Sequence, residues 1–175
     1  MDHLYARLSL SFKIDPEYAK LRSIHLKEVT LTSKYGNSGP VTVNLRSGQE
    51  GIGSPTFPSG SETEEHVVTL LNTSDTEKVL DKSKVSTPLT LDIPAYCRPI
   101  AREDNKTYNL TMITKYDVYD TKGQNLGERK SVNKVQFNIA TVSPGLDKPL
   151  VLTVKPTYLY ILSDNDLNNP IITVN

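Results

Sequence analysis

Hydrophobic and polar residues alternate along much of this chain. The longest alternating stretch runs from residue 107 to residue 139 and contains one reversal, at Asp120-Thr121-Lys122-Gly123. A period of two buries one face of a strand and leaves the other in water. An Asp followed three residues later by a Gly is typical of a tight turn. The stretch therefore predicts a long β-hairpin around which a sheet is built. The inward positions of its outgoing arm are Tyr108, Leu110, Met112, Tyr116 and Val118.

The return arm of this hairpin alternates less regularly. A second glycine after the turn, Gly127, is suited to a positive φ angle. Val135, Phe137 and Ile139 share one parity, whereas Val132 is out of phase with them. We expect a β-bulge or a late start of the strand pairing at Val132.

Another strand pattern lies near the start of the chain, in residues 4–14. Strict alternation over this length predicts a strand with one buried face. Asp15 and Pro16 follow, and an N-cap residue before a proline predicts a short helical turn over residues 16–21. The apolar positions of the strand are Leu4, Ala6, Leu8, Leu10, Phe12 and Ile14.

Residues 24–31 predict the next strand. The apolar parity of this strand shifts before Val29, which predicts a bulge near Lys27 and Glu28. A turn rich in glycine at residues 36–40 then leads into a strand at 41–45. We expect these two strands to form a hairpin.

Residues 46–64 have the weakest structural pattern in the chain. They contain four Gly, four Ser and two Pro. Such a segment buries too little apolar surface to offset its ordering entropy, so we expect a mobile loop within one domain that spans residues 1–175. A linker between two domains is the alternative.

The middle of the chain predicts three further elements. Residues 65–71 are apolar on both parities, which is typical of a strand covered on both faces. Ser74 and Glu77 have the spacing of a capping box and predict a short helix before Val79 and Leu80. Residues 87–93 predict a strand, with Pro88 and Pro94 as markers of its ends or of an edge position. Its inward residues are expected to be Leu89, Leu91 and Ile93.

The C-terminal part of the chain predicts strands at 150–154, 157–162 and 171–174, with a polar turn at 164–170. In total, about nine short strands joined by turns are expected, with little helical periodicity. This pattern predicts an all-β fold, an antiparallel Greek-key β-sandwich with one or two short helical turns.

The overall composition narrows the function. The 20 basic and 20 acidic residues give no net charge, so no general attraction to nucleic acid is expected. Cys97 is the only cysteine, which excludes an internal disulfide bond and a cysteine metal cluster. No run approaches the roughly 18 apolar residues of a transmembrane helix. We expect no transmembrane segment and no cofactor.

Residues typical of catalysis are scattered. His3, His25 and His66 lie far apart in the sequence and form no pair with metal-ligand spacing. No serine lies in a Gly-x-Ser-x-Gly setting. We therefore expect that the chain is not an enzyme.

Two segments near the C-terminus carry candidate binding residues. Asp164, Asp166 and Asn168 have the alternate spacing of a calcium loop, although the sixth position is not Gly and the twelfth is not Glu. A polar turn capped by its own side chains is the alternative. Tyr158 and Tyr160 share one strand face and could stack on a sugar ring, although tyrosine is also a common strand residue.

Several motifs spread over most of the chain form a recognisable set. They are KIDPE at 13–17, KEVTLT at 27–32, the turn Tyr119-Asp120 with Gly123, Asn133-Lys134, LTVKPTYLY at 152–160, LSD at 162–164 and DLNNP at 166–170. Together they resemble the fimbrillin-like proteins of Bacteroidetes, the type V pilin superfamily.

This resemblance implies a structural or adhesive subunit of a bacterial surface fimbria. Such a subunit is exported to the cell surface, outer membrane or fimbrium, and its partners are other fimbrial subunits and a host or bacterial surface ligand. The strand pattern begins directly after Met1-Asp2, so we expect that a leader is not part of this sequence. A surface glycan-binding module that uses Tyr158 and Tyr160 is the alternative function.

The resemblance also implies assembly by β-strand exchange. An alternating segment of one subunit pairs with exposed backbone of the next and fills an apolar groove. Two segments are eligible, residues 4–14 as an occupant of the groove and residues 171–174 as a donor. The side chains expected to take part are Leu4, Leu8, Leu10, Phe12, Ile171, Ile172 and Val174.

Overall fold

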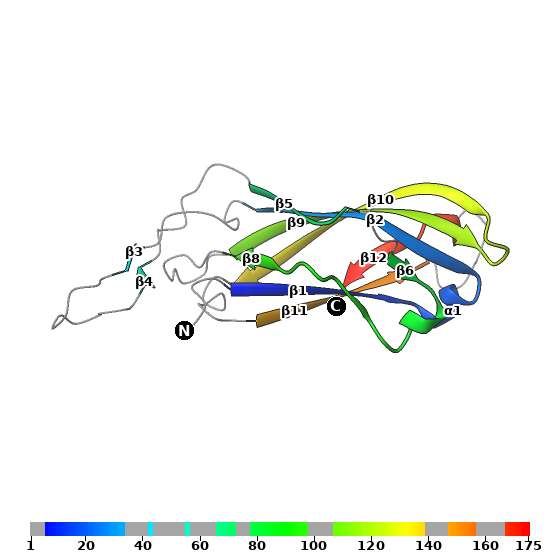
Figure 1. Ribbon diagram of the computed structural model, residues 1–175, viewed down its shortest axis with the longest axis horizontal. Coiled ribbons are helices and arrows are strands. Elements are labelled where there is room, and N and C mark those ends of the chain that lie inside the picture. The colour runs from blue at the N-terminus through cyan, green and yellow to red at the C-terminus, as the bar shows by residue number, and fades with distance from the viewer. Residues whose placement is uncertain are drawn as a thin grey trace.

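The computed structural model describes residues 6–33, 42–43, 55–56, 66–72, 78–97, 107–138, 147–156 and 167–175. Most of these residues belong to two sheets that face each other (Figure 1). Sheet A consists of β1 (Ala6–Ile14), β7 (Leu89–Thr90), β8 (Ala95–Cys97), β11 (Asp147–Lys155) and β12 (Ile171–Val174). Sheet B consists of β2 (Arg22–Ser33), β5 (His66–Asn72), β6 (Lys78–Leu80), β9 (Thr107–Asp120) and β10 (Asn125–Asn138). A separate ribbon pairs β3 (Thr42–Val43) with β4 (Pro55–Thr56).

Strands that are distant in the sequence are neighbours in both sheets. The order is β12-β11-β1-β7 in sheet A, where β8 also pairs with β1, and β10-β9-β2-β5 in sheet B, where β6 also pairs with β2. These connections confirm the predicted all-β sandwich. The pairing of β1 with β11 departs from the antiparallel rule, because these two strands run parallel from Arg7–Asp147 to Ile14–Val154.

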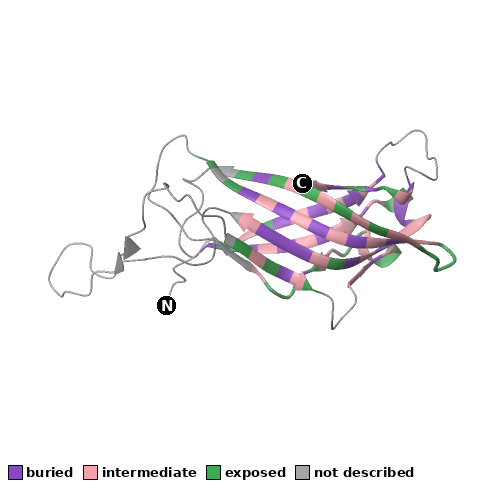
Figure 2. Cartoon of the chain, turned by 90° about the horizontal axis from the view of Figure 1, so that it is seen from above, coloured by how far each residue is buried: buried purple, intermediate pink, exposed green. Residues whose placement is uncertain are grey.

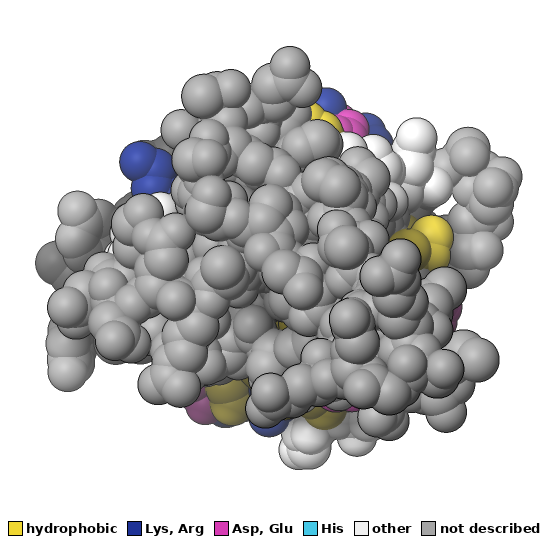
Figure 3. All heavy atoms as spheres, turned by 90° about the vertical axis from the view of Figure 1, so that its left-hand side faces the viewer, with side chains coloured by type: hydrophobic (Ala, Val, Ile, Leu, Met, Phe, Trp, Pro, Cys, Tyr) yellow, Lys and Arg dark blue, Asp and Glu magenta, His cyan; other side chains and the backbone are white. Residues whose placement is uncertain are grey.

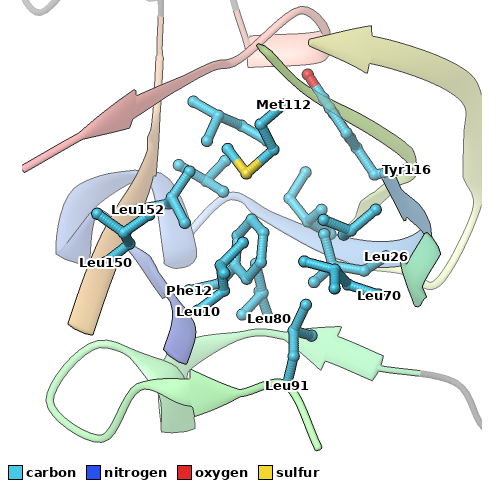
Figure 4. Close-up of a cluster of buried hydrophobic side chains, with 14 of the residues drawn as sticks. Leu10, Phe12, Leu26, Leu70, Leu80, Leu91, Met112, Tyr116, Leu150 and Leu152 are labelled. Carbon is cyan, nitrogen blue, oxygen red and sulfur yellow. The ribbon is translucent and has the colours of Figure 1, made fainter. Parts of the chain in front are cut away.

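One hydrophobic core lies between the two sheets (Figure 4). Buried and less buried residues alternate along the long strands, as the period of two requires (Figure 2). On β9 the alternation continues through Thr114, which is fully buried although it is polar. The largest fully buried side chains include Tyr18, Tyr116, Phe12, Leu10, Ile14, Ile24, Leu26, Leu70, Leu80 and Met112.

The predicted central hairpin is confirmed as β9 and β10. The Asp120 carboxylate accepts hydrogen bonds from the backbone N–H groups of Lys122 and Gln124, both at 2.8 Å. Gly123 and Gly127 adopt φ angles of 81° and 105°. The expected bulge at Val132 is wrong. The register shifts earlier, between the pairs of Asn125 and Glu128, and Val132 pairs regularly with Ile113 and simply faces outward.

The short helix predicted after the first strand is confirmed as α1 (Pro16–Ala19). The Asp15 carboxylate accepts hydrogen bonds from the N–H groups of Glu17 and Tyr18 at 2.9 and 3.0 Å, which satisfies two free donors of the first turn. A 3-10 turn, η1 (Lys82–Lys84), was not predicted. Among the described residues, no helix has the length and apolar character needed to cross a membrane.

Strand β2 contains the predicted bulge but not the predicted hairpin. Its register against β9 shifts between Leu26 and Glu28, as expected. The hairpin between residues 24–31 and 41–45 is wrong, because β3 pairs with β4 while β2 pairs with β9, β5 and β6. Longer complementary strands thus occupy both edges of β2. The predicted loop at 46–64 lies outside the described residues except for Pro55–Thr56.

Two predictions of full burial are wrong. Strand β5 belongs to one of two sheets that enclose a single core, so only one of its faces is covered: Leu70 is buried, while Val67 is 66% exposed. Ile93 is 55% exposed because β7 ends at Thr90 and the chain bends after the buried Leu91, which breaks the alternation. The helix expected before Val79 and Leu80 does not include them, since both belong to β6. Residues 74–77 lie outside the described part.

Candidate strand-exchange site

Strand β1 lies inside sheet A, with neighbours on both sides. It pairs with β11 on one side, and with β7 and β8 on the other. Further backbone hydrogen bonds join Leu91 N–H to the Leu10 carbonyl at 2.9 Å and Asp15 N–H to the Val154 carbonyl at 2.8 Å. A strand leaving this position would therefore expose unpaired backbone on both neighbours.

The inward face of β1 is apolar and almost completely buried. Leu8, Leu10 and Phe12 from the predicted exchange segment are at most 2% exposed, as are Ala6 and Ile14. Burial of each large apolar side chain stabilises the fold by about 1.5 to 3 kcal/mol. Removal of β1 would leave a groove of matching length between its neighbours. Leu4, the other predicted member, lies outside the described residues.

The outward face of β1 carries small polar contacts. Ser9 donates a hydrogen bond from Oγ to Asp147 Oδ1 at 3.0 Å, and Ser11 Oγ lies 3.0 Å from Thr90 Oγ1. Arg7 and Asp147 form a long ion pair at 4.0 Å, and both side chains are more than half exposed. Exposed contacts of this kind contribute little to stability. The attachment of β1 thus comes mainly from apolar burial and backbone pairing.

Strand β12, the second predicted segment, lies at the edge of sheet A and pairs with β11. Of its three predicted exchange residues, Ile172 is buried, Val174 is partly buried and Ile171 is 37% exposed. Asn175 extends the pairing through a hydrogen bond from its N–H to the Val151 carbonyl at 2.9 Å. We refer to residues 167–175, which contain β12, as the C-terminal strap.

Side chains outside sheet A bind the backbone of the C-terminal strap. Tyr18 and Tyr116 donate from their hydroxyl groups to the carbonyls of Leu167 and Pro170 at 2.7 and 2.9 Å. Figure 4 shows the Tyr116 ring at the border of the core, with its hydroxyl directed toward the strap. Both hydrogen bonds are buried, so neither donor nor acceptor can be satisfied by water instead.

Strand β10 supplies two more donors to the strap. Arg129 donates from Nε to the Asn168 carbonyl at 2.9 Å, and Asn133 donates from Nδ2 to the Ile172 carbonyl at 2.6 Å. Four strap carbonyls within six residues therefore accept hydrogen bonds from side chains. We call the four donors Tyr18, Tyr116, Arg129 and Asn133 the latch residues.

Burial keeps the two tyrosines of the latch protonated. Desolvation raises the pKa of Tyr116 to about 12 and raises the pKa of Tyr18 further above its ordinary value. Repulsion from Tyr116 adds to the effect at Tyr18, while Arg22 and Arg129 oppose it. Both hydroxyls are therefore hydrogen-bond donors at neutral pH.

Asn168 is the described member of the predicted calcium set. Its Oδ1 accepts a hydrogen bond from Arg22 Nε at 3.0 Å, and its carbonyl accepts the hydrogen bond from Arg129. Two guanidinium groups thus occupy the oxygens that a cation would need. Asp164 and Asp166 lie outside the described residues, and the described part of the chain contains no group of three or more His, Cys, Asp or Glu side chains able to hold a metal ion.

The sequence contained one signal for the latch. On the return arm of the central hairpin, the inward positions before Val135 are polar, namely Arg129, Ser131 and Asn133. Val132 is out of phase with Val135 because, in this part of β10, the inward positions are polar and the apolar Val132 faces outward. Arg129 and Asn133 donate to strap carbonyls, and Ser131 donates from Oγ to Asn133 Oδ1 at 3.2 Å. Backbone acceptors leave no mark in a sequence.

The remaining candidate residues do not form a site in the described part. His25 stacks on Tyr119 with ring centroids 4.0 Å apart. His3, Tyr158 and Tyr160 lie outside the described residues, so the proposed glycan contact stays a prediction.

Ion pairs cross the outer face of sheet B. Lys27 Nζ lies 2.8 Å from Glu128 and 3.6 Å from Asp117, and Lys115 Nζ lies 2.7 Å from Glu28. The hydrogen bond from Lys27 holds the pKa of the Glu128 carboxyl below its ordinary value. Figure 3 shows the end of the molecule that is on the left in Figure 1. The coloured side chains at this end include hydrophobic, basic and acidic ones. The outer face of sheet B and the end seen in Figure 3 thus carry both acidic and basic side chains. We infer that the ion pairs help to fix the register of the strands.

Comparison with known proteins adds no assignment of family or function. No protein-family model matches this sequence, and a search of curated proteins found no match either.

Proposed function

We propose that this chain is a structural or adhesive subunit of a bacterial surface fimbria that assembles by β-strand exchange and performs no catalysis. In this proposal it is exported and lies at the cell surface, outer membrane or fimbrium. Its partners are other fimbrial subunits and a host or bacterial surface ligand. The motifs that resemble fimbrillin-like proteins supply the biological setting, and the position of β1 carries the structural argument.

The single observation behind the proposal is that β1 completes the core from the interior of sheet A. Its buried residues Leu8, Leu10 and Phe12 enter the core at every second position. Its backbone pairs with β11 along its length. A strand from another subunit could fill the same place if apolar residues occupy every second position and its backbone forms hydrogen bonds along both edges.

The strength of such a joint follows from the same contacts. About ten backbone hydrogen bonds at about 1 kcal/mol each, together with several buried aliphatic or aromatic side chains, favour very slow dissociation. Such a joint would hold two subunits together without a covalent link. The long, exposed ion pair between Arg7 of β1 and Asp147 fits a joint that depends on apolar burial.

The direct test is complementation of a chain that lacks residues 1–14. We expect the truncated chain to be less stable, and to regain thermal stability when it is refolded with a peptide that copies residues 4–14. A control peptide carrying Phe12→Asp should not restore stability, because it places a charge in the core. A peptide carrying Ser11→Asp changes the outward face and should still bind.

The size of the products provides a second readout. When the truncated chain is mixed with the intact chain, we expect it to accept β1 from the intact chain. The product should then be an oligomer, which its size reveals. A truncated chain that is as stable as the full chain and ignores the 4–14 peptide would remove strand exchange at β1. Equal rescue by the Phe12→Asp peptide would also contradict the proposal.

A further inference from the structure

We infer that the latch residues form a binding site for the backbone of the C-terminal strap and keep β12 with its own chain. The ligand of this site is an extended peptide segment that presents carbonyls at the positions of Leu167, Asn168, Pro170 and Ile172. It follows that β1, and not β12, is the segment exchanged between neighbours. This last statement rests on the proposed function, whereas the latch itself does not.

The latch differs from ordinary sheet pairing because three of its donors come from sheet B and the fourth comes from α1. Tyr18 lies on α1, Tyr116 on β9, and Arg129 and Asn133 on β10, whereas β12 belongs to sheet A. Donor distances of 2.6 to 2.9 Å show that all four are engaged at the same time. The strap is therefore tied to both sheets.

Without the latch, β12 would be weakly attached. It has four residues, and among the described strands it pairs only with β11. Ile172 is buried in the core, but Ile171 is partly exposed. The latch adds side-chain hydrogen bonds over residues 167–172 and so extends the attachment beyond the paired strand.

The attachment of β1 has a different character. Its inward residues are apolar, and its side-chain hydrogen bonds in the described part, at Ser9 and Ser11, are on the outward face. An alternating strand of different sequence can reproduce such contacts. A strap that leaves its site abandons four specific donors, two of them buried tyrosine hydroxyls. The strap, which has specific side-chain donors, therefore stays with its own chain, whereas β1 can be replaced by a strand of another subunit.

A peptide-uptake experiment on the full chain tests the inference. The probe is a fluorescent peptide that copies residues 167–175, added to the folded protein in urea concentrations below the unfolding transition. The latch variant is Tyr116→Phe with Asn133→Ala, which removes one hydroxyl and one amide donor. We expect this variant to take up the peptide at least about tenfold faster than the wild type, since about 1.4 kcal/mol corresponds to a factor of ten.

The matched control is Tyr119→Phe with Asn109→Ala. It removes the same chemical groups from β9, where Tyr119 accepts a hydrogen bond from Asn125 and Asn109 donates one to the Thr107 carbonyl. The control should take up the peptide at the wild-type rate. Hydrogen exchange of residues 167–175 should accelerate in the latch variant and not in the control.

The results separate this inference from the proposed function. Uptake by the wild type as fast as by the latch variant overturns the latch, and so does uptake by the latch variant no faster than by the control. A parallel arm with a labelled peptide of residues 4–14 reports on β1. Failure of that arm in every variant contradicts strand exchange at β1, while the comparison of latch variant and control still decides whether the strap is latched.

Discussion

The hydroxyl of Tyr116 on β9 donates a buried hydrogen bond of 2.9 Å to the carbonyl of Pro170, which lies 54 residues later in the sequence. This contact ties sheet B to the segment that enters the edge strand of sheet A. It explains why a tyrosine stands in the core, where its ring packs as a hydrophobe while its polar end binds backbone. The Tyr18 hydroxyl does the same at Leu167.

Replacement of Tyr116 by Phe should destabilise the fold by about 1 to 3 kcal/mol. The ring remains, but the Pro170 carbonyl loses its donor in a buried setting. Urea unfolding of the two proteins measures the difference. Tyr119→Phe serves as control because its hydroxyl accepts a long 3.3 Å hydrogen bond from Asn125 on the exposed face, and it should change stability by less than about 0.5 kcal/mol.

Stability should fall as the pH rises above about 10. Burial raises the pKa of Tyr116 to about 12 in the folded chain from an ordinary value of 10.0. Between these values the unfolded chain has lost the proton and the folded chain keeps it, so raising the pH favours unfolding. Tyr116 alone should account for about 1 kcal/mol of lost stability between pH 9 and pH 11.

Urea midpoints at the two pH values provide this measurement. Tyr18 acts in the same direction, because burial raises its pKa as well. Tyr116→Phe should therefore lose less stability over this interval than the wild type, but not become insensitive to pH. An equal loss in both proteins would show that Tyr116 is not buried as described.

Thr114→Val should stabilise the protein by about 1 kcal/mol. The Thr114 hydroxyl is fully buried and has no hydrogen-bond partner among the described residues. Valine has nearly the same shape, and it removes the desolvation cost of an unpaired hydroxyl. Thermal unfolding tests this, and a clear loss of stability would indicate that the hydroxyl has a partner.

Gly127→Ala should cost more stability than Gly123→Ala. Both glycines have positive φ angles, which cost roughly 1 to 2 kcal/mol for a residue with a Cβ. At Gly123 an added Cβ meets nothing within 4 Å, whereas at Gly127 it comes within 3.2 Å of Arg129 Nη1. The difference between the two variants, measured by urea unfolding, therefore reports on the space that the Arg129 guanidinium needs to reach the strap. Equal costs would contradict this.

Local patterns in the sequence predicted the parts of the fold that local rules determine. Alternation placed β1 and the β9–β10 hairpin, and Asp15-Pro16 placed α1, because strand period and helix capping act over a few residues. The exposure of Val67 and Ile93 was not predictable in this way, since it depends on how many layers cover a sheet and on where a strand ends.

The candidate site was predictable only in part. The buried face of β1 follows from Leu8, Leu10 and Phe12. The sequence contains a signal only for the two latch residues on β10, whose inward positions are polar. Tyr18 reads as a helix residue and Tyr116 as a core residue, and their acceptors are backbone carbonyls far along the chain.

The central claim is that β1 is an exchangeable strand, and a reversible lock on β1 tests it most directly. Ala6 on β1 is the registered partner of Cys97 on β8. Because the two backbone positions are directly opposed in antiparallel strands, Ala6→Cys sets a second cysteine at the register position opposite residue 97, and the oxidised variant is tested for a disulfide before use. The measurement is uptake of a labelled 4–14 peptide by the full-length variant in mild urea, with and without reductant. The account predicts that the oxidised protein takes up no peptide, and that reduction restores uptake to the wild-type rate. Uptake that is the same in both redox states of a protein shown to carry the disulfide, or a wild type that never takes up the peptide, would contradict it.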